Sequence, residues 1–142
     1  RPPPRSTLFP YTTLFRSDGS VSWGIMESNT SNSTISLPDT EVIHSDSNVN
    51  IDLNVKSSNA TGGSVNWTLG STSGTDTFVY EYSSNSGSNW NTFLIPDSYY
   101  SFVSGLTPDS TQNLDLRITT PTVSSEFDQK TITVTIQAVQ SS

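Results

Sequence analysis

Apolar and polar residues alternate along much of this chain, and the clearest example follows a proline-containing turn. Leu114, Leu116 and Ile118 alternate with polar residues, which is the two-residue period of a β-strand with one buried face. A tight turn at residues 107–110, with proline in its second position, precedes this strand. Pro121 ends the strand, because proline has no N–H to donate to a neighbouring strand.

The same alternation predicts further short strands. In the longest run, Val49, Ile51, Leu53 and Val55 share one face. The predicted strands lie at residues 21–26, 35–37, 41–44, 49–55, 65–69, 78–82, 90–95, 114–119 and 131–139. No stretch has a sustained helical period, and each strand needs a second sheet to cover its apolar face. The predicted fold class is therefore all-β, an antiparallel two-sheet sandwich of seven to nine strands.

Two stretches resemble the immunoglobulin-like repeats of prokaryotic surface proteins. The first is the turn and strand of residues 105–121, and the second is the Thr- and Val-rich stretch 131–139. The resemblance covers residues 48–139, and the chain departs from antibody domains because it has no cysteine. It implies an immunoglobulin-like sandwich in an extracellular or cell-surface setting, without implying an activity.

Residues 1–17 differ from the rest of the chain and resemble translated sequencing adapter. Leu8–Ser17 match, in one reading frame, the ten codons of a common short-read library adapter. We therefore expect a non-native adapter-derived segment at 1–17 and a single β-sandwich domain at 18–142. We also expect a metagenomic source and a natural N-terminus that this sequence lacks. The alternative is a basic, proline-rich linker or an edge strand.

Composition limits the classes of partner. The chain contains 27 Ser and 20 Thr, and its formal net charge is −7. Without residues 1–17, three basic residues and all 13 acidic residues remain, so the charge becomes −10. An acidic surface repels phosphate groups, so we expect no nucleic acid partner and no membrane contact by this domain.

Candidate catalytic and metal-binding residues are few. His44 is the only histidine, and there is no cysteine, so a nucleophile with a positioned base is not indicated. A calcium loop begins at Asp46, but Ile51 stands where that loop needs glycine. Calcium held between loop acids is the remaining metal hypothesis, with Asp46, Asp97, Asp109 and Asp128 as candidates. We expect no catalytic residues, no resident metal and no cofactor.

Aromatic residues are the candidate binding residues. Trp90, Tyr99, Tyr100 and Phe102 could form a platform on which sugar rings stack, and the last three lie on a predicted connection between strands. The alternative is that they pack in the core or against another subunit, because aromatic side chains supply much of the burial in a core with few aliphatic residues. Sequons at Asn29, Asn32, Asn59 and Asn66 permit glycosylation.

Two functional hypotheses follow from these observations. The first is a non-catalytic extracellular structural or adhesive module of a prokaryotic surface protein or assembly, secreted or displayed at the cell surface. Its partners would be protein neighbours in that assembly or surface glycans. The alternative is a carbohydrate-binding module detached from a larger enzyme.

Overall fold

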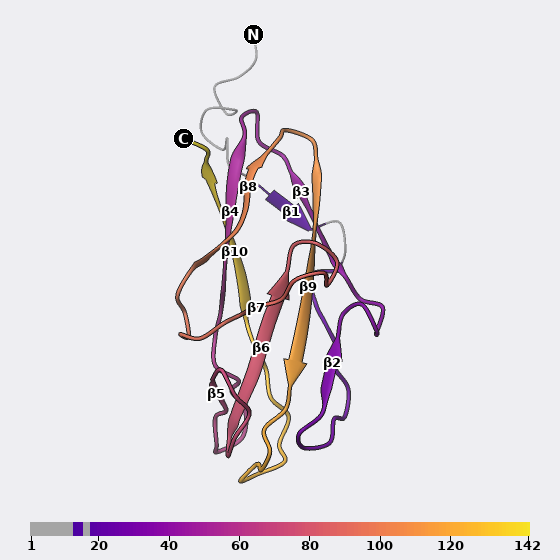
Figure 1. Cartoon of the computed structure of the whole chain (residues 1–142), viewed down its shortest axis with the longest axis vertical. Helices are drawn as coiled ribbons and strands as arrows, with labels where there is room; N and C mark the ends of the chain where they lie inside the picture. The colour runs from indigo at the N-terminus through magenta and orange to yellow at the C-terminus, as the bar shows by residue number, and fades with distance from the viewer. Residues whose placement is uncertain (1–12, 16–17) are drawn as a thin grey trace.

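The computed structural model of the chain describes residues 13–15 and 18–142 (Figure 1). These residues contain no helix, and their ten β-strands form two sheets. The strands are β1 (Thr13–Phe15), β2 (Ser31–Ser33), β3 (Glu41–Ser45), β4 (Ile51–Ser57), β5 (Thr68–Leu69), β6 (Thr77–Ser83), β7 (Asn91–Thr92), β8 (Tyr100–Leu106), β9 (Thr111–Thr119) and β10 (Val134–Gln140). The predicted all-β two-sheet sandwich is confirmed, and nine of the ten strands lie within residues 18–142.

The two sheets differ in size. The larger has the order β1-β3-β9-β6-β5, and in addition β2 pairs with β9 and β7 with β6. The smaller has the order β10-β4-β8. Every pair of strands is antiparallel except the two-residue pairing of β5 with β6. Because three strands face a wider sheet, the smaller sheet leaves part of the larger one to be covered by loops.

The core lies between the sheets and is rich in aromatic rings. From the smaller sheet, β4 contributes three side chains with no exposed surface, and β9 and β6 contribute the facing residues. These residues are Ile51, Leu53 and Val55 of β4, Leu114, Leu116 and Ile118 of β9, and Phe78, Tyr80 and Tyr82 of β6. Phe93 joins them, with its ring centroid 4.7 Å from that of Tyr82. Packed ring pairs of this kind add stability beyond the area that they bury.

The predicted turn before β9 is present. Ser110 N donates to Thr107 O at 3.3 Å, and Asp109 has a φ of 60°. Proline in the second position supplies the required φ, and aspartate is among the residues that tolerate a left-handed conformation in the third. The turn therefore leads directly into β9, as predicted.

One edge of β9 is shared by two strands. β2 pairs with residues 117–119 of β9, and β3 pairs with residues 111–114. Between them, residues 34–40 leave the sheet, and Figure 1 shows this loop projecting from one side of the molecule. Asp115 closes the base of the loop, because its Oδ1 accepts hydrogen bonds from Thr34 Oγ1 at 2.8 Å and Thr40 Oγ1 at 2.5 Å. The predicted strand at 35–37 is therefore wrong: these residues belong to the loop.

The predicted strand at 21–26 is also absent, and this stretch is irregular. Gly24 interrupts it with a φ of 69°, which an extended strand does not allow. Trp23 nevertheless reaches the core, where its ring packs edge-on against Tyr80 at 6.2 Å. The alternation of apolar residues thus indicated the packing of Val21 and Trp23 against the core, but Ile25, on the same predicted face, is fully exposed.

The last two long strands lie in different sheets. β10 pairs with β4 over seven residues, whereas β9 pairs with β3 and β6. In immunoglobulin domains the last two strands are neighbours in one sheet. The sandwich architecture is established, and the immunoglobulin-like relationship remains a prediction.

Candidate functional site

A groove opens between the larger sheet and the stretch that leads into β10, the edge strand of the smaller sheet. It has a volume of about 380 Å³. Its floor is apolar, formed by Tyr80, Leu114 and Leu116, each at most 4% exposed. Val21 and Trp23 also line the groove, together with residues 129–132 and Val134, where the chain leads into β10. The groove therefore lies between the two sheets, at the place where the smaller sheet ends.

Lys130 lines this groove without offering a free positive charge to it. Its side chain is 6% exposed, and its ammonium group donates to the carbonyls of Gly62 and Val65 and to Glu126 Oε1 at 2.5 Å. These three bonds use all three donors of the ammonium group. Lys130 therefore has a structural role, because it joins the loop at residues 62–65 to Glu126.

Glu126 joins the same two loops. Besides Lys130, its carboxylate accepts hydrogen bonds from Val65 N at 2.8 Å and Ser64 N at 3.0 Å. The Lys130 hydrogen bond, followed by the two backbone N–H groups, lowers the pKa of Glu126 to about 2. Hydrogen bonds to the charged form of a carboxyl group have this effect.

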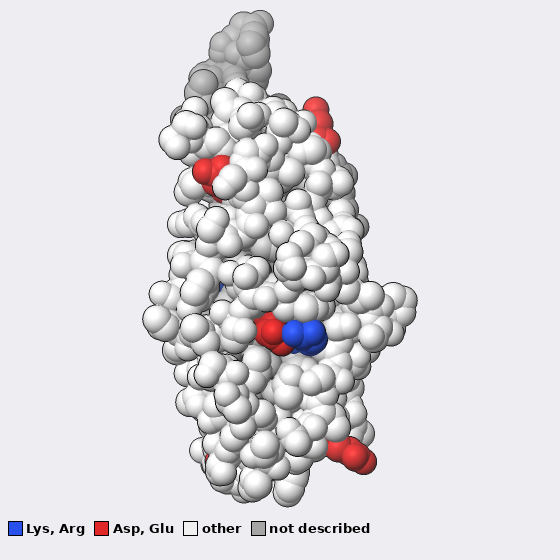
Figure 2. All heavy atoms as spheres, viewed as in Figure 1, with Lys and Arg blue, Asp and Glu red and all other residues white. Residues whose placement is uncertain are grey.

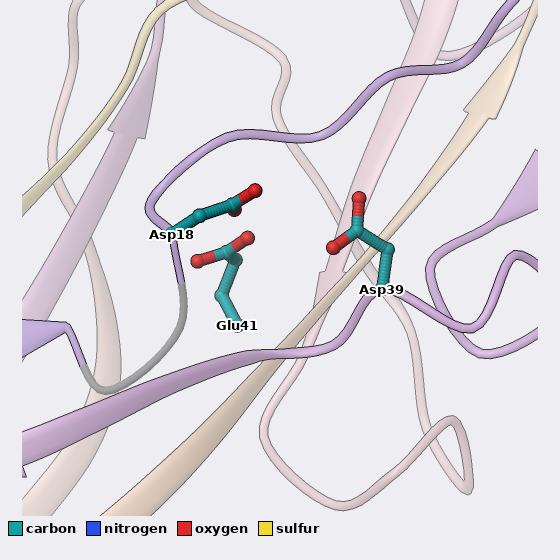
Figure 3. Close-up of side chains that lie close together, drawn as sticks. All are labelled: Asp18, Asp39 and Glu41. Atoms are coloured by element: carbon teal, nitrogen blue, oxygen red, sulfur yellow. The ribbon is translucent and has the colours of Figure 1, made fainter.

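Three carboxylates lie close together, as Figure 3 shows, and one of them, Glu41, lines the groove. Glu41 comes from β3 and is 4% exposed, Asp39 precedes that strand, and Asp18 comes from the N-terminal stretch. One oxygen from each lies within 4.8 Å of the others, and Gly19 N donates to Glu41 Oε2 at 3.1 Å. Among the described residues this is the only group of three or more side chains able to hold a metal ion. The predicted calcium candidates Asp46, Asp97, Asp109 and Asp128 do not form such a group.

A second, shallower hollow lies on the outer face of the larger sheet. It has a volume of about 190 Å³ and is lined by Ser31, Asn32, Ser33, Ser36 and Arg117. Arg117 of β9 makes a two-pronged ion pair with Glu81 of β6, with N···O distances of 2.9 and 2.7 Å. These hydrogen bonds raise the pKa of Arg117. Figure 2 shows a face of the molecule on which most of the surface is uncharged.

The four predicted aromatic residues do not form one exposed platform. Trp90 lies against Arg117, whose guanidinium carbon is 4.6 Å from the ring centroid. Tyr99 is 41% exposed and lies near Lys56, with the ammonium nitrogen 4.8 Å from its ring centroid. Phe102 is 8% exposed and belongs to the core, and Tyr100 packs against that core. The alternative of core packing thus describes Tyr100 and Phe102, while Trp90 and Tyr99 remain candidates for binding.

Tyr100 has a structural role that its sequence position did not reveal. Its hydroxyl oxygen accepts hydrogen bonds from Leu94 N at 3.3 Å and Ile95 N at 3.1 Å. These bonds hold the β7–β8 connection, on which Leu94 and Ile95 are 50% and 59% exposed. Figure 1 shows this connection projecting on the side opposite the 34–40 loop.

His44 lies on β3 between two carboxylates. Its Nδ1 is 2.9 Å from Asp46 Oδ1 and its Nε2 is 4.0 Å from Asp109 Oδ1. Both ring nitrogens therefore face acids. A serine protease-like arrangement instead requires the histidine to contact a nucleophilic hydroxyl.

Comparison with known proteins adds no relative to this picture. No protein-family model matches the chain, and neither a curated protein nor a solved structure is similar to it. The described residues include no helix with the length and apolar character that a membrane span requires. The groove and the outer-face hollow are therefore the features from which a function can be inferred.

Sequence reasoning missed the groove and the three carboxylates beside it. Asp39 and Glu41 are two residues apart, but Asp18 is distant from them in the sequence, and no spacing rule joins the three. A signal was present in the apolar alternation of Val21 and Trp23 with polar residues, which indicated a buried face in a segment that forms no strand.

Proposed function

We propose that residues 18–142 form a non-catalytic structural or adhesive module, secreted or displayed at a prokaryotic cell surface, that acts by contact with neighbouring protein chains. The observation that carries this proposal is the open side of the sandwich. There, an apolar groove opens at the start of β10, where Val134 lines it, and β10 is an edge strand of the smaller sheet. Edge strands are sites of protein association unless they are protected.

The surface of the domain fits such a role. Arg117, Lys130 and Lys56 are the only basic residues of 18–142, and each is engaged with Glu81, Glu126 or the Tyr99 ring. An acidic, hydroxyl-rich surface favours solubility and repels phosphate groups, so protein neighbours are better partners than nucleic acid or lipid. The immunoglobulin-like relationship and the extracellular location belong to this proposal.

Sequencing the source DNA across the junction between Ser17 and Asp18 tests the proposed function. We expect an open reading frame that continues upstream of Asp18 with a secretion signal and further β-sandwich repeats. A cytoplasmic start, or a fused catalytic domain, would contradict a structural surface module. The same experiment decides whether residues 1–17 are adapter-derived.

A carbohydrate-binding module is the second candidate, and the outer-face hollow favours it. The hollow is lined by hydroxyl and amide groups and by Arg117, and the ring of Trp90 lies against that guanidinium. Because Arg117 occupies one face of Trp90, a sugar ring would stack on the other face. Calorimetric titration with neutral oligosaccharides should then show saturable binding that Trp90→Ala abolishes and that Phe127→Ala, the loss of another exposed aromatic ring, retains. No heat of binding at millimolar sugar would remove this candidate.

A further inference from the structure

We propose that the exposed part of the β7–β8 connection, residues 94–99, is the contact surface of a twofold dimer of this chain. This inference rests on the proposed function, because it names the neighbouring chain and the surface that meets it. Three features carry it: exposed apolar side chains on a fixed backbone, a surrounding stretch with little charge, and one cation and one anion at its border.

The connection exposes apolar side chains that lie outside the core. Leu94, Ile95 and Tyr99 are 50%, 59% and 41% exposed, and none of them belongs to the core or packs against it. Pro96, between Ile95 and Tyr99, is also exposed. A single exposed apolar residue is ordinary, whereas several that are close together mark a contact surface.

Hydrogen bonds fix the backbone that presents these side chains. The hydroxyl oxygen of Tyr100 accepts from the N–H groups of Leu94 and Ile95. Further along, Asp97 N donates to Ser57 O of β4 at 2.8 Å. A segment that is already held in one conformation loses little conformational entropy on association, so more of the contact energy remains as affinity.

Charge is scarce in this part of the chain. Asp97 is the one charged residue of 82–108, although residues 18–142 hold 13 acidic and three basic residues. Exposed apolar and aromatic side chains with few charges are typical of the centre of a protein interface. Figure 1 shows the connection projecting from the side of the molecule, so two copies can meet there while most of their acidic surface stays apart.

One cation and one anion border the connection. The ammonium nitrogen of Lys56 lies 4.8 Å from the centroid of the Tyr99 ring, and Asp97 is held beside Ser57, the residue after Lys56. The ion pairs within the described residues include neither Lys56 nor Asp97. Arg117 and Lys130, by contrast, each pair with a glutamate.

These two charges point to a second copy of the chain as the occupant. In a twofold interface the same surface of each copy meets the other, so every contact between two different residues occurs twice. Lys56 of one copy would face Asp97 of the other, and the two pairs would flank the apolar side chains. The surface is therefore complementary to itself in charge as well as in polarity.

Sedimentation equilibrium of the full chain over a range of concentrations tests the proposal. We expect a reversible monomer–dimer equilibrium at physiological salt. Ile95→Ser should weaken dimerisation at least about tenfold, because it removes an apolar side chain from the centre of the contact. Phe127→Ser, which removes an apolar side chain that is 90% exposed elsewhere, is the matched control and should leave dimerisation unchanged. Both variants should keep the melting temperature of the unchanged chain.

Exchange of the two charges tests the twofold geometry. Lys56→Glu alone and Asp97→Lys alone should each weaken dimerisation at least about tenfold, because each places like charges opposite one another in both pairs. The double variant keeps the net charge and restores both pairs in reverse, so it should recover dimerisation to within about threefold. Asp128→Lys, which alters the net charge as Asp97→Lys does, is the control and should not weaken dimerisation.

Several results would overturn the inference. A chain that stays monomeric up to millimolar concentration would exclude a second copy as the occupant. Association that Ile95→Ser leaves intact would place the contact elsewhere, and a double variant that stays monomeric would exclude the twofold pairing. Sedimentation of a monomeric chain with phosphatidylcholine vesicles, abolished by Ile95→Ser, would make a lipid surface the occupant instead. None of these outcomes depends on the upstream DNA, so failure here and failure of the proposed surface role are separable.

Discussion

Asp115 shows how one side chain can hold an irregular segment on a regular sheet. The sequence pattern places it on the polar face of β9, yet it is 1% exposed because the 34–40 loop covers it. Its Oδ1 accepts from both Thr34 and Thr40, and Thr34 Oγ1 in turn accepts from Leu116 N at 3.0 Å. Burying a carboxylate that has these hydrogen-bond partners costs little free energy. Without the carboxylate, the same hydroxyl groups would have no acceptor, and the folded state would be less stable.

The Asp115→Ala variant should therefore lose about 2 kcal/mol of unfolding free energy, because it leaves the buried hydroxyl group of Thr34 and the partly buried one of Thr40 without their acceptor. Asp115→Asn keeps an oxygen at the same position and should lose clearly less. Urea denaturation of both variants gives the comparison. Equal losses would show that the negative charge, rather than the acceptor geometry, stabilises this site.

Glu126 predicts how the protein responds to acid. Its pKa is about 2 in the folded protein, against an ordinary value of 4.5, mainly because of the Lys130 hydrogen bond. Between these two pH values the unfolded chain binds more protons at this group, so unfolding free energy falls as the pH falls from about 4.5 to about 2. Urea denaturation as a function of pH should show this loss, and Glu126→Gln should remove that part of the dependence. Glu27→Gln, an exposed substitution elsewhere, is the control.

At the scale of the elements, the alternation of apolar and polar residues predicted the strands that span the core. It did not predict strands whose pairing is irregular or very short. β4, β6 and β9 were located to within a few residues because their inner faces are continuous. The sequence pattern did not predict β8. Its pairing with β4 is interrupted by register shifts between Ile51 and Asn54, and these shifts disturb the alternation of apolar and polar residues along β8. β5 is reduced to two residues that pair in parallel with β6, which no hairpin signal predicts.

The candidate site was less predictable than the fold. An antiparallel sandwich can be inferred from each strand by itself, whereas the groove depends on which strands are neighbours. That Tyr100 points inward beside Val55 while Tyr99 lies near Lys56 depends on the register of β8 against β4. Register between strands distant in sequence leaves no local trace in composition or spacing.

Tyr100→Phe tests the anchoring of the β7–β8 connection. The ring keeps its contacts with Phe93 and Tyr82, but Leu94 N and Ile95 N lose their acceptor. We expect a stability loss of about 1 kcal/mol and faster amide exchange confined to residues 94–95. Exchange that accelerates throughout β8 would instead indicate that the hydroxyl supports the whole strand.

The pairing of β1 with β3 brings the predicted adapter segment into the larger sheet. Thr13–Phe15 lie opposite Ile43–Ser45 at its edge. A short edge strand contributes little, so deletion of residues 1–17 should change the unfolding free energy by at most about 1 kcal/mol. Urea denaturation of the two chains measures this. A larger loss would show that these residues are part of the folding unit and would count against a foreign origin.

At the scale of the molecule, excess negative charge should govern the response to salt. Residues 18–142 hold 13 acidic and three basic residues, so screening reduces more repulsion than attraction. Raising sodium chloride from low concentration to about half molar should increase the melting temperature by about 3 °C, equivalent to roughly 1 kcal/mol. Scanning calorimetry measures this shift. A decrease would mean that the pairs Arg117–Glu81 and Lys130–Glu126 dominate.

The same charge predicts the absence of phosphate-bearing partners. Labelled duplex DNA and anionic lipid vesicles should both fail to bind residues 18–142 at low salt, where electrostatic attraction is strongest. Fluorescence anisotropy and vesicle sedimentation provide the measurements. Saturable binding to either would require a basic surface that the three engaged cations do not supply.

The closed base of the 34–40 loop makes the domain a ready acceptor of new sequence. Thr34 and Thr40 are fastened to one carboxylate oxygen, so the chain leaves the sheet and returns to it at the same point whatever lies between. Peptides of different length and composition can be grafted in place of residues 35–39 while β2 and β3 keep their places on β9. The sequence of this loop can therefore vary, in nature or in a designed library, without disturbing the fold.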